Sequence, residues 1–409
     1  MFKNIPEYII PVLDALEGAG YEAYLVGGCV RDRAMGKEPN DYDVTTNAKP
    51  HEMQEVFRSY RVIETGLKHG TLTVVSMGEC VEVTTYRIDG EYADNRHPTS
   101  VSFTDDVTLD LSRRDFTVNA MAYSRSLGLC DPFCGMDDLA RKMIVCVGSP
   151  TERFSEDGLR ILRALRFASV LEFAIDGETS CAIHSMKELL RGISKERIYT
   201  ELRKLLCGGY ASRIMKEYAD VLSVCAEGLS PEAIEGASDK ISSIEKDPVL
   251  RLAYICRLSA DMSSADPSSH AADVCKRLKT SSADIKRASL FAGLIGKALP
   301  EGRFETKYLM GRLPIEDIRS YAALRAVFTG DEGEAERFIR LYDSVLADDP
   351  CVTVSQLTVG GRDVIERTGK KGVYIGKVLS HLLDEVICER LPNERDALLE
   401  AMDALPDEL

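Results

Sequence analysis

The sequence predicts an α+β protein in which a small mixed-sheet domain at the N-terminus is followed by an all-α remainder. Two observations carry this prediction. Short β-rich runs recur up to about residue 147, and helical patterns separate some of them. After Pro150 no convincing strand can be recognised, and apolar residues follow helical spacing to the end of the chain. At 409 residues the chain is too long for one ordinary core, so we expect roughly two to four domains.

The N-terminal part begins with a predicted helix over residues 5–19, where apolar residues recur at helical spacing up to Gly18 and Gly20. A second helix is expected over Pro50–Ser59, because proline is favoured at the first helical position. The predicted strands of this domain are Tyr24–Val26, Asp43–Thr45, Arg61–Ile63, Thr71–Ser76, Val81–Arg87 and Ile144–Val147.

Three breaks divide the helical part of the chain. Gly208-Gly209 interrupts one helical pattern, and the region from Gly228 to Asp239 interrupts another. Residues 260–270 are expected to form a polar loop. No internal repeat of fixed period is found, so we expect two or three separate helical modules rather than a repeat array.

Composition excludes several classes of protein. The formal net charge of −15 argues against a generally basic nucleic-acid binder, although a local basic face remains compatible with it. The twelve cysteines include no CxxC pair, which favours reduced thiols in a cytoplasmic protein over a disulfide or zinc framework. No signal peptide and no membrane-spanning run can be recognised.

The first chemistry-bearing segment joins a glycine pair to two aspartates. Gly27 and Gly28 follow a short apolar strand, and glycine lets backbone N–H groups approach a phosphate closely. Asp41 and Asp43 lie one residue apart, so on a strand both point to one face. Such a pair beside a phosphate-binding turn suits a Mg²⁺-bound triphosphate, whereas an isolated pair is usually a solvated surface feature. Glu82 is a candidate third carboxylate on a neighbouring strand, with an ordinary solvent-facing glutamate as the alternative.

The second segment contains adjacent arginines at positions 113 and 114. Their guanidinium groups offer paired donors for phosphate oxygens. Asp115 and Asn119 follow at a spacing of four residues, and these side chains can reach a ribose hydroxyl or hold an arginine in place. Taken alone, this pattern is most often a solvated helix start.

The third segment is an arginine-rich helix that we expect Ser155 to cap. Asp157 and Arg160 lie three residues apart and place an acceptor beside a donor. Cytosine and adenine present an amino group next to a ring-nitrogen acceptor, whereas guanine and uracil present a carbonyl next to an N–H. The pair would therefore accept C and A and reject G and U. Arg163 and Arg166 continue the polar stripe, and a salt-bridged amphipathic helix is the alternative interpretation.

In this order and spacing, the three segments resemble the class II tRNA nucleotidyltransferase and bacterial poly(A) polymerase family. The motifs that carry the resemblance are Gly27-Gly28-x-Val30-Arg31-Asp32, Asp41-x-Asp43, Arg113-Arg114-Asp115-Phe116-Thr117-Val118-Asn119-Ala120, Asp131-Pro132-Phe133 and Glu156-Asp157-x-x-Arg160-x-x-Arg163-Ala164-x-Arg166-Phe167. A weaker match, Gly360 to Glu366, is similar to the family's tail domain. The resemblance implies a nucleotidyltransferase head over 1–148, a nucleotide-selecting neck over 149–210, a helical body over 211–340 and a tRNA-binding tail over 341–409.

The family resemblance also implies an activity and a set of site residues. A member of this family would add CCA to tRNA 3′ ends from CTP and ATP, without a nucleic-acid template, and release pyrophosphate. Asp41 and Asp43 would hold two Mg²⁺ ions, one lowering the pKa of the RNA 3′-hydroxyl and one stabilising the leaving group. The remaining implied contacts are Gly28, Arg31 and Arg114 to the triphosphate, Asp157 and Arg160 to the base, and Arg163 and Arg166 to the rest of the nucleotide.

Two departures from the family pattern and several alternatives accompany this hypothesis. Cys134 stands where a glycine is usual, and His97 stands where a second arginine is frequent. The segment 89–98 is similar to the flexible loop needed for adding the terminal A, and its full length favours CCA or A addition over CC addition alone. An A-adding enzyme or a poly(A) polymerase is the alternative within the family, although the acidic end at Leu405–Leu409 does not suit the latter.

Other classes of function fit the residues less well. No histidine is followed by aspartate, so an appended HD phosphohydrolase activity is not expected. A non-catalytic RNA-binding protein would not need both aspartates, and a small-molecule nucleotidyltransferase would not need the Asp157–Arg160 helix. We infer no protein partner and no membrane association.

Overall fold

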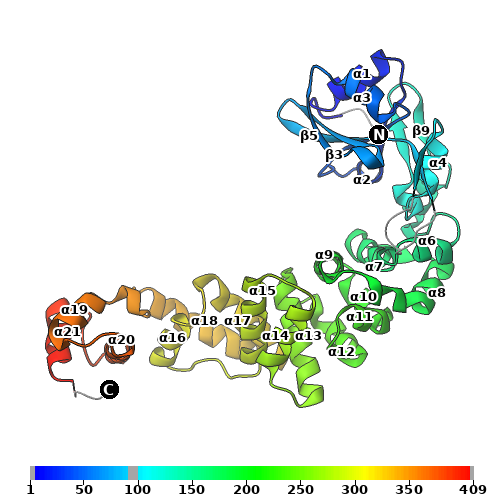
Figure 1. Ribbon diagram of the computed structural model, residues 1–409. Coiled ribbons are helices and arrows are strands. Elements are labelled where there is room, and N and C mark those ends of the chain that lie inside the picture. Colours follow the sequence, from blue (N-terminus) through cyan, green and yellow to red (C-terminus); the bar gives the residue numbers. More distant parts are fainter. Residues whose placement is uncertain (1–4, 91–99, 406–409) are drawn as a thin grey trace.

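A computed structural model describes residues 5–90 and 100–405 of the chain. The molecule is hook-shaped: the N-terminal sheet domain lies at one end, the chain turns through a group of helices, and a long helical arm leads away to the C-terminus (Figure 1). The sheet domain and the arm face each other across an open space. The predicted order, a mixed sheet first and helices after it, is confirmed.

The sheet domain is built on a seven-stranded sheet in the described residues, with the strand order β3-β4-β5-β2-β1-β8-β9. Its strands are β1 (Ala23–Val26), β2 (Asp43–Thr46), β3 (Arg61–Gly66), β4 (Thr71–Ser76), β5 (Glu79–Thr85), β8 (Ala122–Ser124) and β9 (Gly128–Cys130). The pairing of β2 with β5 is parallel and the other pairings are antiparallel. A separate two-stranded ribbon pairs β6 (Arg87–Asp89) with β7 (Val101–Phe103).

Short helices and turns complete this domain. Helix α1 spans Ile10–Gly18 and starts later than predicted, because Pro11 lacks an N–H and fits only in the first turn. Helix α3 (Pro50–Val56) starts at the predicted proline. The other elements are α2 (Gly28–Ala34), η1 (Leu67–His69), α4 (Val107–Ser112), η2 (Thr117–Asn119) and α5 (Gly135–Arg141).

A second short β-ladder joins the sheet domain to the helices that follow. Strand β10 (Met143–Ile144) pairs in parallel with β11 (Ala174–Ile175). The expectation of no strand after Pro150 is therefore wrong, and the predicted strand Ile144–Val147 is shorter and starts one residue earlier. Two-residue strands carry too little periodicity to be read from a sequence. The helices around this ladder are α6 (Pro150–Glu156), α7 (Leu159–Leu171), α8 (Gly177–Met186), η3 (Lys187–Gly192) and α9 (Lys195–Leu206).

The arm consists of helices joined by short turns. The predicted break at Gly208-Gly209 is confirmed between α9 and α10. The other two breaks are smaller than predicted: α12 covers most of 228–239 because Ser230 caps it and Pro231 starts it, and residues 264–266 alone separate α13 from α14. The first helices of the arm are α10 (Ala211–Glu217), α11 (Ala219–Cys225), α12 (Pro231–Ile241), α13 (Pro248–Ser263), α14 (Pro267–Arg277) and α15 (Ser282–Leu294). The last elements are α16 (Arg303–Met310), α17 (Ile315–Thr329), α18 (Glu332–Leu346), η4 (Val354–Gln356), α19 (Gly361–Thr368), α20 (Val373–Ile387) and α21 (Arg395–Asp403).

Two of the hydrophobic cores set the large-scale organisation. One is continuous from Ile9 in the sheet domain to Val345 in α18. The other lies at the C-terminal end and includes Leu357, Leu382 and Met402. The long core holds the sheet domain, the turn of the hook and most of the arm together, whereas the C-terminal helices pack among themselves.

Candidate active site

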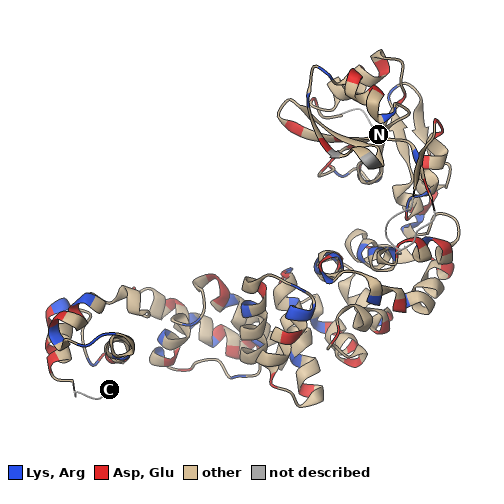
Figure 2. Cartoon of the chain, viewed as in Figure 1, with Lys and Arg blue, Asp and Glu red and all other residues tan. Residues whose placement is uncertain are grey.

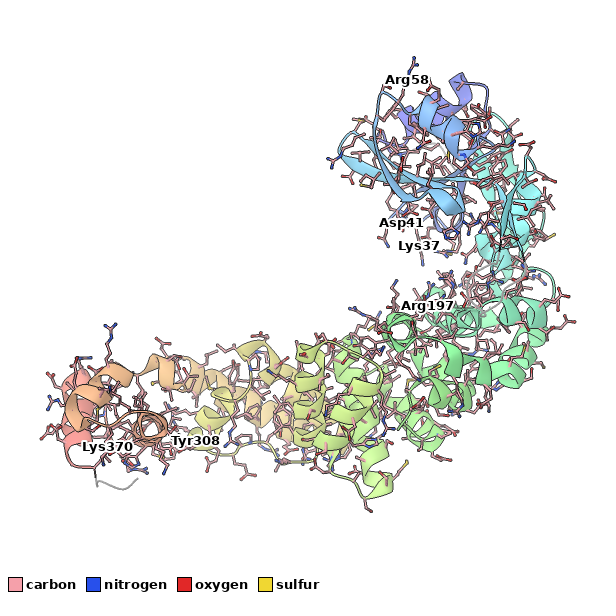
Figure 3. All side chains as sticks on the ribbon, viewed as in Figure 1. Lys37, Asp41, Arg58, Arg197, Tyr308 and Lys370 are labelled. Carbon is pink, nitrogen blue, oxygen red and sulfur yellow. The ribbon has the colours of Figure 1, made fainter. Side chains whose placement is uncertain are left out.

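Three carboxylates gather on one face of the sheet, on the side of the domain that faces the arm. Asp43 is the first residue of β2, and Asp41 precedes it by two positions. Glu82 on β5 lies directly opposite Asp43 in the parallel ladder, so both side chains leave the sheet on the same face. All three residues are exposed, and Figure 3 shows Asp41 on the edge of the domain that borders the open space. The register confirms that Asp43 and Glu82 lie side by side, whereas Asp41 lies outside the strand.

The charges of this group affect one another. The Asp43 carboxyl opens to solvent on one side only, and the partial loss of hydration, followed by the charges of Asp41 and Glu82, raises its pKa to about 6. Concentrated negative charge on oxygen donors is the chemistry that a hard divalent cation neutralises. Among the described residues no group of three or more His, Cys, Asp or Glu side chains forms a ready-made metal cluster. The fit to a divalent metal therefore depends on the two aspartates and their charge.

The turn between β1 and α2 brings an arginine close to these carboxylates. Gly27 has φ +77° and ψ −128°, a conformation that glycine adopts without strain. A Cβ at this position would lie 2.8 Å from Nη1 of Arg114, whereas one on Gly28 would make only ordinary contact with Arg31. Burial lowers the pKa of Arg114, and the charges of Asp110 and Asp43 partly offset that effect. Gly27 is therefore the position of the pair at which this geometry requires glycine.

Arg31 lies in a buried network behind the turn. It donates to Oδ1 of Asn119 at 2.7 Å and to Oδ1 of Asp32 at 2.8 Å. Asn119 in turn donates to Asp115 at 3.1 Å, and Asp115 accepts two bonds from Arg163 at 2.8 and 2.6 Å. The expectation that Asn119 and Asp115 hold arginines in place is confirmed, although this segment is buried and is not a solvated helix start.

The charge of Asp115 is strongly stabilised by this network. Burial alone would raise the pKa of Asp115, but the Arg163 guanidinium and the Asn119 amide outweigh it and hold the pKa at about 2. Asp115 belongs to the sheet domain and Arg163 to α7. The ion pair therefore connects the sheet domain to the turn of the hook.

Asp157 and Arg160 lie at a break between two helices. Ser155 does not cap α7: it lies inside α6 and its hydroxyl donates to Thr151. Helix α6 begins earlier than expected because Pro150 follows a residue with extended backbone, Ser149. Asp157 follows α6 with φ −139° and ψ 104°, and α7 begins two residues later.

The Arg160 N–H donates to the Asp157 carbonyl at 2.9 Å, but the two side chains are held by different partners and not by each other. Asp157 accepts from the Leu159 N–H at 3.0 Å and from Nη2 of Arg197 at 2.8 Å. Arg160 contacts Glu156 through Nη1 and donates to the carbonyl of Arg113 at 2.8 Å through Nη2. Three of the five guanidinium hydrogens of Arg160 are thus used, counting the bond to the Arg153 carbonyl at 3.1 Å. Both side chains are fixed in place, and each has hydrogen-bonding capacity left.

Three arginines surround the ring of Phe167 on α7. The guanidinium carbon of Arg166 lies 3.5 Å from the ring centroid, and those of Arg31 and Arg163 lie at 5.2 and 5.3 Å. Glu201 on α9 accepts from Arg166 at 2.7 Å. The carboxylates of Asp32, Asp115 and Glu201 balance the three guanidinium charges, and the cluster joins α2, α7 and α9.

The two departures from the family pattern have different outcomes. Cys134 has φ +58°, the left-handed conformation that glycine would adopt more easily, and it precedes α5. A Cβ on the next residue, Gly135, would collide with the Thr117 carbonyl, so the retained glycine is required. His97 and most of the loop at 89–98 lie outside the described residues.

Several residues of the site were missed in the sequence. Glu156, Arg197 and Glu201 hold the predicted residues in place. Glu156 was noted only as part of the family motif, and Arg197 and Glu201 were not singled out. On α9 the charged residues are spaced as on any amphipathic helix, so only the fold reveals that they face α7.

Fold and site together define a nucleotidyltransferase. Family models agree: the poly(A) polymerase head domain matches residues 23–145, the probable RNA- and SrmB-binding site of polymerase A matches 172–221, and the putative tRNA nucleotidyltransferase domain 2 matches 262–402. A CCA-adding enzyme of Levilactobacillus brevis is 35% identical over 406 residues, which cover 96% of each chain. The chain belongs to the family of CCA-adding enzymes.

Solved structures show the same relationship. The crystal structure of a Bacillus stearothermophilus CCA-adding enzyme in complex with CTP is similar, with a TM-score of 0.80 and 30% identity over 98% of this chain and 97% of that one. The Thermotoga maritima CCA-adding enzyme complexed with tRNA shares the fold, with a TM-score of 0.64 and 20% identity over 98% of this chain and 96% of that one. In the described part of the chain, no helix is long and apolar enough to cross a membrane.

Proposed function

We propose that this protein adds C, C and A to the 3′ ends of tRNA from CTP and ATP and releases pyrophosphate. The observation that supports the proposal is the presence of two groups of polar side chains, one on the sheet and one at the start of the helical part. A carboxylate pair lies on the sheet face, and the fixed side chains of Asp157 and Arg160 lie at the break between α6 and α7. The family membership of the whole chain supports the same activity.

We assign the metal-binding role to Asp41 and Asp43, with Glu82 as a third carboxylate beside them. Their family and donor chemistry suit a divalent metal, and we propose Mg²⁺. When bound, this metal would activate the RNA 3′-hydroxyl and neutralise charge that develops on the phosphates. Arg114, Arg31 and Gly28 would bind the triphosphate, with Gly27 keeping the turn open to Arg114.

Base selection is assigned to Asp157 and Arg160. The carboxylate can accept from the amino group of cytosine or adenine, and the free N–H groups of Arg160 can donate to the adjacent ring nitrogen. Uracil and guanine would leave both groups unpaired. Arg163 and Arg166 complete the nucleotide site as parts of the cluster around Phe167.

We further propose that successive parts of the chain have different roles, and that the protein is located in the cytoplasm. The head (1–148) carries the metal-binding carboxylates, the neck (149–210) selects the base, and the body (211–340) and tail (341–409) support the tRNA. Separate packing of the C-terminal helices supports the tail as a unit. The names of the relatives do not favour the alternative of an A-adding enzyme or a poly(A) polymerase.

The activity can be tested with three tRNA primers that end at the discriminator base, in C or in CC. With Mg²⁺, CTP and ATP, the wild-type protein should complete each primer to CCA and then stop. Extension with ATP into a long homopolymer, or failure to use CTP, would contradict the proposal. D41N and D43N should abolish incorporation, whereas D137N, which removes an exposed carboxylate of the same domain, should not.

A further inference from the structure

Arg197 on α9 reaches across to the carboxylate of Asp157 in the neck. Its Nη2 lies 2.8 Å from Oδ2, while the N–H of Leu159 lies 3.0 Å from Oδ1. Each oxygen of this carboxylate therefore accepts one bond from the protein, and the plane of the group is fixed. Figure 3 shows Arg197 on α9, on the side of that helix that faces the sheet domain.

The position of Asp157 leaves its carboxylate poorly restrained without a bond to another helix. Because Asp157 has extended backbone between α6 and α7, no turn of helix packs against its side chain on both sides. Its side chain is only 17% exposed, yet a short acidic side chain at a helix break has several accessible rotamers. The Leu159 N–H belongs to the same turn and moves with Asp157. The bond to Arg197 therefore connects the carboxylate to a different helix, α9.

Helix α9 is a rigid base for this contact. One turn beyond Arg197, Glu201 is buried and accepts from Arg166 at 2.7 Å. Helix α9 packs along α7, and its Ile198, Leu202 and Leu205 are buried in the long core. Arg197 thus links α9 to Asp157 at the end of α6. Glu201 links α9 to α7 by pairing with Arg166 and, at 3.7 Å, with Arg163. A guanidinium held in this way can fix a partner to within about 0.5 Å.

We propose that Arg197 is a positioning residue that sets base selectivity by orienting the Asp157 carboxylate. This inference rests on the proposed function, in which Asp157 accepts from the amino group of C or A. With its plane fixed, the carboxylate presents its remaining lone pairs in one direction, and a carbonyl of U or G placed there is repelled. A carboxylate released from Arg197 can rotate away from that carbonyl, so discrimination falls more than correct addition does.

The test compares R197Q with R203Q and R197K. Arg203 is an exposed arginine on the same helix, so R203Q makes the same change of charge and side-chain length away from the neck. The measurement is kcat/KM for CTP and UTP on tRNA ending at the discriminator base, and for ATP and GTP on tRNA ending in CC. R197Q should lower the CTP/UTP and ATP/GTP ratios by roughly tenfold to a hundredfold, with a smaller fall in kcat/KM for CTP itself. R203Q should keep the wild-type ratios, and R197K should restore part of the loss.

Each other result has a definite meaning. Equal falls in kcat/KM for CTP and UTP in R197Q would overturn the inference, because they would mark Arg197 as a phosphate or RNA contact. Ratios in R197Q within about twofold of the wild type would overturn it as well. If R197Q does not fold, as judged by its thermal transition, the R197K variant is used instead. A CTP/UTP ratio lowered at least about threefold in R197K supports the inference, and an unchanged ratio overturns it. Failure of the wild-type protein to add C or A would instead contradict the proposed function.

Discussion

Gly27 is the residue on which the turn beside the carboxylates depends most directly. In G27A, the backbone at φ +77° would be strained and the new Cβ would lie 2.8 Å from the Arg114 guanidinium. We expect Arg114 to be displaced from Asp43 and kcat/KM for CTP to fall about a hundredfold, measured by incorporation into tRNA.

Gly36 offers the control for this substitution. It also has a positive φ, +72°, but a Cβ there would meet nothing within 4 Å. G36A should therefore cost about 1 kcal/mol of stability and leave kcat/KM near the wild-type value. Equal losses of activity in both variants would show that backbone strain, and not the approach of Arg114, limits the site.

The low pKa of Asp115 predicts how the stability of the protein depends on pH. Its pKa is about 2 in the folded protein against an ordinary value of 3.8, so the folded state holds its charged form more strongly. The resulting stabilisation, about 2 kcal/mol, is fully present above about pH 4 and is lost as the pH falls through 2. D115N should therefore lower the free energy of unfolding by about this amount at pH 7.

Denaturant unfolding followed by circular dichroism can check this expectation at pH 7, 4 and 2.5. The difference between the wild type and D115N should shrink towards the lowest pH. A difference that stays constant over this range would contradict the assigned pKa.

At the level of residues, the sequence predicted the candidate site residues but only some of the residues that hold them. Asp43 and Glu82 could be placed on one face because alternation along a strand is a fixed geometric rule. The partner of Asp157 could not be predicted, because Arg197 is forty positions away and the contact exists only when α9 lies along α7. The same holds for Arg160, which is bound to the carbonyl of Arg113.

Among the elements, α9 is held at its C-terminal end by a buried arginine from α13. Arg251 is 2% exposed, and it donates to the carbonyls of Leu206, Ile244 and Glu245. R251M should leave these carbonyls without partners and cost about 3 kcal/mol, seen in calorimetry as a lower transition temperature. R213M removes an exposed pair with Glu217 and should cost less than about 0.5 kcal/mol. A similar shift in both variants would contradict the anchoring role.

Helices and strands were predicted well where they are long and have a clear local pattern of residues. Strand β4 was predicted to the residue, because six residues with many β-branched side chains give a clear signal. Strands β7, β8 and β9 have three residues each and were missed. The α12 region was taken for a break because of its glycine and serine content, whereas Ser230 and Pro231 start a helix there.

At the scale of the whole molecule, the separate core of the C-terminal helices predicts that these helices unfold independently of the rest of the chain. Apart from smaller contacts, Lys307 on α16 joins the two parts by donating to Glu389 at 2.8 Å and to the Ile387 carbonyl at 3.4 Å. In hydrogen exchange, amides of α19, α20 and α21 should open together and before those of α7. K307M should raise exchange in these helices roughly tenfold and leave α7 unchanged. Equal acceleration in α7 would show that the chain opens as one unit.

The charge distribution of the whole chain agrees with a local site for RNA. Figure 2 shows acidic and basic segments interspersed along the arm, with basic segments on α7 and α9 at the turn of the hook. The net charge of −15 therefore describes the surface in general and not the site. The acidic composition excluded a generally basic binder, but it could not reveal that the arginines of the site converge on Phe167.

The arginines around Phe167 also have a thermodynamic consequence. Arg31, Arg163 and Arg166 are held by carboxylates or an amide of the protein itself, and immobilising such a long side chain costs up to about 2 kcal/mol. That entropy is lost when the protein folds and not when a nucleotide arrives. A ligand that binds these arginines therefore does not have to lose that side-chain entropy. An inhibitor that fits the arginines in their present positions would bind more tightly than it would to a flexible site.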